Sequence, residues 1–147
     1  MIGMTQLSQN VKIRLVKAYQ GAGTSPFASD EVDMQGWDGV TFIAKFGTSN
    51  AGNTFKLQHD TATGMASAVD LLGTSVVPSA NACLAVMDVY KPLERFIRAY
   101  ATIGSSSTLE FIIAIQYQGH VLGDATLNNV TNVVMSELHV SPIAGTA

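Results

Sequence analysis

The stretch Cys83–Thr102, CLAVMDVYKPLERFIRAYAT, decides the fold class of this chain. It contains two runs in which charged residues alternate with aromatic and β-branched residues, and Lys91-Pro92 separates the runs. Alternation with a period of two is typical of half-buried strands, and a proline between two such runs indicates a turn. The stretch therefore predicts two β-strands joined by a turn. It also holds five of the chain's few charges: Asp88, Lys91, Glu94, Arg95 and Arg98.

The same period dominates the rest of the chain, where clusters of Gly, Ser, Asn and Pro bound the apolar runs. The run FIIAI, Phe111–Ile115, is continuously apolar, which indicates a central strand or burial on both faces. No segment shows a convincing amphipathic helix, so we expect an all-β chain folded as a sandwich or a barrel. The expected strands span residues 11–16, 32–34, 40–46, 54–60, 82–90, 96–103 and 108–118, with a short strand within 70–77.

The composition indicates one domain whose surface is partly covered by partners. The 147 residues match the size of a single domain, which we assign to residues 1–147. Only 13% of the residues are charged, whereas about 25% is typical of a soluble domain, and the mean hydropathy is +0.24. This deficit of charge favours an oligomer. We interpret residues 1–10 and 119–147 as extended terminal segments and candidate assembly arms.

Charge and targeting signals exclude several classes of partner. The net charge of −3 and the pI of about 5.4 do not fit a nucleic-acid binder, which needs clustered Lys and Arg. Residues 1–10 show neither the basic nor the apolar region of a secretory signal, so we expect none. The longest apolar run, residues 82–87, is too short to span a bilayer. Cys83 is the only cysteine, so no intrachain disulfide forms, and we expect it to be a small core residue.

No motif in the sequence predicts catalysis, a cofactor or a metal. The histidines His59, His120 and His139 lack the spacing of metal ligands, and no phosphate-binding loop is present. The acids of residues 30–33 lack the ligand pattern of a calcium-binding loop and are interpreted as an acidic loop. We therefore expect a protein that is not an enzyme.

Two groups of residues are candidates for an interface. Lys12 and Arg14 precede every acid of the chain, whereas Asp30, Glu31, Asp33 and Asp38 follow soon after. The two groups either pair across neighbouring subunits or lie on solvated strand faces.

Trp37 is the only tryptophan, and three readings of it stay open: packing within the chain, anchoring an interface, or stacking on a sugar. Around the turn at Lys91, the odd spacing of Arg95 and Arg98 places them on opposite faces of a strand, unless Arg95 still belongs to the turn. Arg98 pairs either with Asp88 or Glu110 of its own chain, or with a partner protein.

Three blocks of the chain together resemble the small decoration, or cement, proteins of tailed-bacteriophage capsids. They are VDMQGWDGVTFIAKFG (residues 32–47), LAVMDVYKPLERFIRAYAT (residues 84–102) and FIIAIQYQG (residues 111–119). The resemblance implies a jelly-roll-like β-sandwich, often a homotrimer, that binds the major capsid protein where capsid subunits meet.

The implied role is to reinforce the shell, without enzymatic activity and without a cofactor, metal, nucleic-acid or membrane partner. The protein is then made in the host cytoplasm and located on the capsid surface of the virion. Two alternatives stay open: a carbohydrate-binding sandwich with Trp37 and Tyr100 as platforms, and another virion component such as a tail-tube or head-completion protein.

Overall fold

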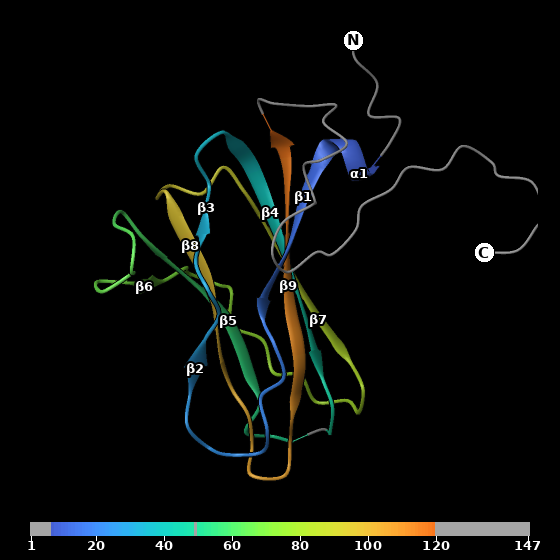
Figure 1. Cartoon of the computed structure of the whole chain (residues 1–147). Helices are drawn as coiled ribbons and strands as arrows, with labels where there is room; N and C mark the ends of the chain where they lie inside the picture. The colour runs from blue at the N-terminus through green and yellow to red at the C-terminus, as the bar shows by residue number, and fades with distance from the viewer. Residues whose placement is uncertain (1–6, 49, 120–147) are drawn as a thin grey trace, which may run out of the picture.

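The computed structural model describes residues 7–48 and 50–119, which form two antiparallel sheets packed face to face (Figure 1). The first sheet has the order β1-β9-β4-β7, with β1 (Val11–Lys17), β9 (Leu109–Gly119), β4 (Trp37–Phe46) and β7 (Leu84–Tyr90). The second has the order β2-β8-β5-β6, with β2 (Phe27–Ala28), β8 (Phe96–Thr102), β5 (Thr54–Asp60) and β6 (Val69–Asp70). The short strand β3 (Val32–Asp33) also pairs with β8.

The order of the strands is that of a jelly roll. The chain passes from β1 in the first sheet to β2 and β3 in the second, and β4 returns to the first. It crosses again to β5 and β6, and β7, β8 and β9 then alternate between the sheets. Two interlocked sheets of this kind define the jelly-roll class. The all-β, jelly-roll-like sandwich is therefore confirmed.

Alternation along the strands builds the core between the two sheets. In β4, Phe42, Ala44 and Phe46 point inward and are fully buried, while Ile43 and Lys45 between them are partly exposed. Phe46 meets Phe55 of β5 edge to face, with ring centroids 6.3 Å apart. Because β4 and β5 belong to different sheets, this contact joins the sheets directly.

Most expected strands are present, with small differences at their ends. The run FIIAI lies in β9, which is central between β1 and β4, as predicted. Cys83 is half-buried against the core. The sequence did not indicate β2, nor the single helical turn α1 (Leu7–Asn10), which forms where an extended segment was expected. The proposed arm beyond Gly119 and residues 1–6 lie outside the described residues.

Phe42 provides a test of this core. Replacing Phe42 with Ala removes a fully buried ring and is expected to lower the free energy of unfolding by ~3–5 kcal/mol. Leu72 is fully exposed, so Leu72→Ala is the control and should change stability by less than ~0.5 kcal/mol. Chemical denaturation followed by tryptophan fluorescence measures both. Equal effects of the two substitutions would contradict the assigned core.

Candidate interaction site

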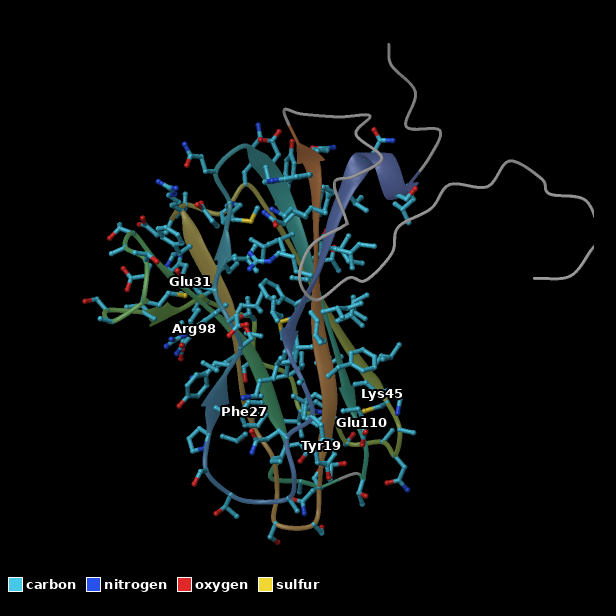
Figure 2. The ribbon with its side chains drawn as sticks, viewed as in Figure 1. Tyr19, Phe27, Glu31, Lys45, Arg98 and Glu110 are labelled. Atoms are coloured by element: carbon cyan, nitrogen blue, oxygen red, sulfur yellow. The ribbon has the colours of Figure 1, made fainter. Side chains whose placement is uncertain are left out.

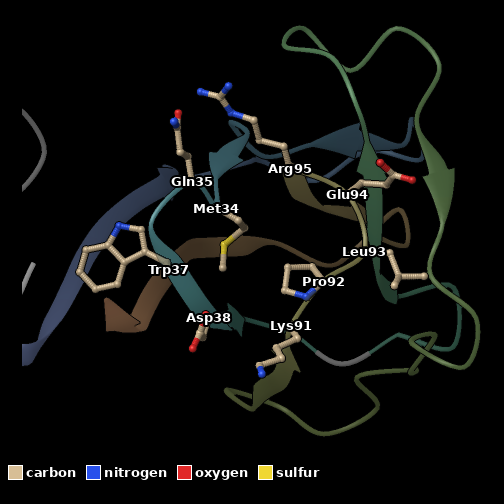
Figure 3. A pocket seen from close by; sticks show the side chains of 9 residues that line it. All are labelled: Met34, Gln35, Trp37, Asp38, Lys91, Pro92, Leu93, Glu94 and Arg95. Atoms are coloured by element: carbon tan, nitrogen blue, oxygen red, sulfur yellow. The ribbon is translucent and has the colours of Figure 1, made fainter. Parts of the chain in front are cut away.

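The loop from β7 to β8 and the turn before β4 enclose an open pocket of about 430 Å³ at one end of the sandwich (Figure 3). It brings together three residues that the sequence singled out, Trp37, Lys91 and Arg95, from two separate parts of the chain. In the close-up, the Trp37 ring points away from Pro92, and Arg95 and Glu94 lie on the opposite rim. The lining residues are Met34, Gln35, Trp37, Asp38, Lys91, Pro92, Leu93, Glu94 and Arg95.

Arg95 is held by a two-pronged ion pair with Asp33. Its Nε and Nη2 donate to the two carboxylate oxygens of Asp33 at 2.8 and 2.7 Å. A backbone hydrogen bond joins the same two segments: the Met34 amide donates to the Arg95 carbonyl at 2.8 Å. The guanidinium holds the pKa of Asp33 below its ordinary value, and the Gln35 amide acts in the same direction. The pair fixes the start of β8 against β3.

A buried side-chain amide of the first sheet helps to position Asp33 of this pair. Gln116 of β9 is almost completely buried, and its Nε2 donates to the backbone carbonyl of Asp33 at 2.9 Å. Sequence reasoning did not select Gln116. The sequence did contain a signal for it. Gln116 lies on the same inward face of the strand as Ile112 and Ala114. A polar side chain on an inward face is buried, and a buried amide needs a hydrogen-bond partner.

Lys91 has an unusual backbone conformation. Its φ is +50°, in the left-handed region that non-glycine residues rarely adopt. Its amide donates to the Asp38 carbonyl at 2.6 Å, which closes the turn onto β4. The next residues are Pro92 and Leu93, and the Leu93 side chain is 90% exposed. The loop is thus held at both ends and presents an aliphatic side chain to solvent.

Trp37 packs within the chain. It lies opposite Gly119 in the ladder of β4 and β9, and a Cβ added to Gly119 would lie 2.6 Å from the indole Cζ3. Two residues along, the Tyr117 ring covers Gly39 in the same way. Only glycine allows a ring this close to the backbone. The intrachain-packing interpretation of Trp37 therefore holds, and part of the ring remains exposed.

Lys12 and Arg14 lie near the acids within the same chain. Arg14 lines a second pocket, of about 680 Å³, together with Glu31, Asp33 and Arg95. Lys12 contributes to the lowered pKa of Asp33. Lys12 and Arg14 are therefore neighbours of Glu31 and Asp33 in one molecule. The sequence had left two readings open, pairing across subunits or solvated strand faces.

Arg98 lies apart from the other candidate residues. On the outer face of the second sheet, its Nε donates to Gln58 Oε1 at 3.0 Å. The suggested intrachain partners were wrong. Asp88 lies in the first sheet and accepts hydrogen bonds from Thr41 and Tyr117, while Glu110 accepts one from Thr108.

Tyr100 is on the same outer face as Arg98, beneath the Lys56 amine, whose Nζ is 5.1 Å from the ring centroid. Trp37 belongs to the other sheet. The two aromatic residues that the carbohydrate-binding alternative names as platforms therefore lie in different sheets.

The acidic loop of residues 30–33 forms hydrogen bonds with another loop of the same chain. The Glu31 carboxylate accepts hydrogen bonds from the Thr63 hydroxyl and from the Gly64 amide, the latter at 2.7 Å. Within residues 7–48 and 50–119, no group of three or more His, Cys, Asp or Glu side chains is placed to hold a metal ion. In the same ranges no helix has the length and apolar character needed to cross a membrane.

Comparison with known proteins bears on the fold. No protein-family model matches the sequence, and no curated protein is significantly similar to it. The structure is similar to the PBSX exported protein XepA, with a TM-score of 0.55 and 17% identity over 99% of this chain and 47% of that protein. This chain thus spans about half the length of XepA. A protein of the Bacillus endospore appendages, a family of disulfide-linked pili, gives a TM-score of 0.48 and 16% identity over 80% of this chain and 96% of that protein.

The ion pair predicts a specific dependence of stability on pH. Because the pKa of Asp33 is lowered in the folded protein, its contribution is present above the ordinary pKa of about 3.9 and disappears as the pH falls through the folded value. Both side chains are about half exposed, so we expect Asp33→Asn to cost no more than ~1 kcal/mol at pH 7. This difference from the unsubstituted protein should close as the pH falls below about 3.9.

Urea unfolding at a series of pH values measures the difference. Glu94→Gln, on the rim of the same pocket, is the control for the loss of one negative charge. A difference that stays the same down to the lowest pH would show that Asp33→Asn acts through packing and not through the ion pair.

Proposed function

We propose that this chain is a structural protein that binds the outer surface of a bacteriophage capsid as a homotrimer and stabilises the shell. Its partner is the major capsid protein, and its place is the virion surface. The resemblance of the three sequence blocks to cement proteins suggests this role, and all three lie in strands of the sandwich or the turns beside them. The jelly-roll fold is compatible with the role but occurs with many functions.

One observation carries the proposal: Leu93 is exposed on a loop whose backbone is fixed on both sides. The loop is held by the Lys91 amide and by the ion pair of Arg95 with Asp33. An aliphatic side chain on a prearranged loop binds a partner with little loss of conformational freedom. The strained backbone of Lys91 is also typical of residues at functional sites. We therefore assign loop 91–95 to the contact with the capsid.

The low charge of the chain supports the same assignment. A trimer on a symmetric shell repeats each contact, so that individually weak contacts combine into stable attachment. Contacts of this kind need uncharged surface, and charged residues are depleted at the core of protein interfaces. In this interpretation, Lys91 and Glu94 beside Leu93 set the orientation of the contact.

Leu93 and Leu72 form a matched pair of test positions. Both are exposed leucines on loops, so aspartate at either position should leave the fold intact. We expect Leu93→Asp to weaken binding to capsids that lack this protein by at least ~10-fold, equivalent to about 1.4 kcal/mol. Leu72→Asp should bind as the unsubstituted protein does. Co-sedimentation with purified capsids measures both, and equal binding of the two variants would remove loop 91–95 from the contact.

The oligomeric state is tested separately. Native mass spectrometry of the full chain should show a trimer at micromolar concentration. A protein that remains monomeric at high concentration and does not sediment with capsids would contradict the proposal as a whole. In that case, binding to a glycan array that is lost on Trp37→Ala with folding intact would favour the carbohydrate-binding alternative.

A further inference from the structure

Strand β7 (Leu84–Tyr90) is the last strand of the first sheet, and within residues 7–48 and 50–119 it pairs only with β4. The outer strands of the second sheet, β2 and β6, have two residues each, whereas β7 has seven. Figure 1 shows β7 at the margin of the sandwich, beside β4. The sheet therefore ends in a long strand whose second side pairs with no described strand.

The pairing with β4 determines which backbone groups of β7 face this edge. At one end, the Phe46 amide donates to the Cys83 carbonyl at 3.0 Å. At the other end, the Lys91 amide donates to the Asp38 carbonyl at 2.6 Å. In an antiparallel ladder, alternate residues bond to the same side, so the odd-numbered residues of β7 bond towards β4. The backbone N–H and C=O groups of the even-numbered residues point the other way; these are Leu84, Val86, Asp88 and Tyr90.

The edge lacks the features that commonly prevent strands from pairing, which are proline, lysine and bulges. β7 contains no proline or lysine, and its register with β4 is regular over all seven residues. Its one charge is Asp88, whose carboxylate accepts hydrogen bonds from the hydroxyls of Thr41 at 2.9 Å and Tyr117 at 2.8 Å. Both donors belong to the same sheet, so the charge is held over that sheet and away from the edge.

The side chains at this edge are mainly apolar and open to solvent. Leu84, Val86 and Tyr90 are 59%, 58% and 56% exposed. They lie on the outer face of the sheet, on the side that Lys45 marks in Figure 2, since Lys45 is opposite Leu84 in the ladder. Backbone groups without a strand partner in the described part of the chain, flanked by apolar side chains, form a template for a further strand.

A second copy of β7 completes this edge. In an antiparallel pair with a two-fold axis at Met87, Leu84 lies opposite Tyr90 of the partner subunit. Val86 then lies opposite Asp88 of the partner subunit. All four outward-facing residues exchange both of their backbone bonds, which gives about eight hydrogen bonds.

Other two-fold registers are less favourable. An axis at Val86 leaves the outward groups of Tyr90 without an opposite residue of the strand. An axis at Asp88 places the two carboxylates directly opposite each other, which is destabilising. With the axis at Met87 the two carboxylates are only diagonal neighbours, at roughly 7–8 Å. Repulsion between solvated charges at that distance is weak compared with the two additional hydrogen bonds.

We propose that β7 pairs with β7 of a second copy of this chain, antiparallel about Met87, so that the two first sheets become one continuous sheet. A two-fold contact cannot close a ring of three, so in the trimer proposed above it joins copies that belong to two different trimers. The inference goes beyond capsid binding and does not rest on it, because it concerns the isolated chain.

Disulfide cross-linking tests the contact and its register. In a Cys83→Ser background, Leu84→Cys and Tyr90→Cys each place a single thiol at the edge. The Cα atoms of position 84 and of position 90 in the partner subunit are then about 5.5 Å apart, within the range of a disulfide. Positions 84 of the two copies are ~20 Å apart. Oxidation of the mixed variants with copper phenanthroline should give at least ~10-fold more dimer on a non-reducing gel than either variant alone.

A third thiol measures random collision. Leu72 is a fully exposed leucine on a loop outside β7, so Leu72→Cys mixed with Leu84→Cys should give no more dimer than the single variants. Equal cross-linking in the two mixtures would overturn the proposal. The same holds if no mixture yields a dimer, or if Leu84→Cys alone yields as much as the mixture with Tyr90→Cys.

Two substitutions at Val86 test the backbone bonds in the mixed variants. Val86→Pro removes an N–H that points to the edge, so the ladder with β4 remains. It should lower the amount of cross-linked dimer at least ~10-fold. Val86→Thr keeps the N–H and a β-branched side chain, and should leave the amount unchanged. Cross-linking that survives the proline contradicts the proposed pairing.

Charge replaces proline as the test if Val86→Pro lowers the unfolding midpoint. Position 86 lies opposite Asp88 of the partner subunit in the proposed register. Val86→Asp should therefore weaken cross-linking, because like charges directly opposite repel, whereas Val86→Lys should not. Both substitutions remove the same apolar side chain, so equal effects of the two would overturn the register and the proposal with it.

Discussion

The hydrogen bond from the Gln116 side chain to the Asp33 carbonyl sets the geometry of the end of the sandwich that carries the candidate site. It crosses the core, because Gln116 belongs to β9 of the first sheet and Asp33 to β3 of the second. The Gln116 side chain is almost completely buried, so losing the bond would remove the carbonyl partner of a buried amide. The bond therefore fixes β3, β3 fixes the Asp33 carboxylate, and the carboxylate holds Arg95.

The contrast between the two outer faces explains the low charge of the chain. In the second sheet, Lys56 pairs with Asp70, and neighbouring polar groups satisfy one another across the strands. In the first sheet, the outward positions of the four strands are mainly aliphatic. A jelly roll needs apolar residues only on the two inner faces. Part of the excess of apolar residues therefore lies on this outer face, while other exposed apolar side chains, such as Val69, Leu72 and Val77, lie in β6 and the loop after it.

Alternation along the chain predicted the strands well and the partners poorly, and both outcomes have one physical cause. A period of two shows which side chains share a face, as in β5, whose bounds Thr54 and Asp60 the sequence predicted. The period does not show in which sheet a strand lies. Arg98 was therefore matched with Asp88, which the jelly-roll winding places in the other sheet. Likewise, Asp33 and Arg95 are 62 positions apart, and only the pairing of β3 with β8 brings them together.

The turn at Lys91 shows how the fold and the candidate site share one constraint. The chain leaves the first sheet at Tyr90 and enters the second at Phe96, so loop 91–95 must cross the end of the core. Proline at position 92 disfavours the right-handed helical region for the residue before it, and Lys91 adopts the left-handed one instead. A strained residue persists only where its neighbours hold it. Here the Asp38 carbonyl and the Arg95–Asp33 pair hold it, and the same contacts keep Leu93 in a defined exposed position.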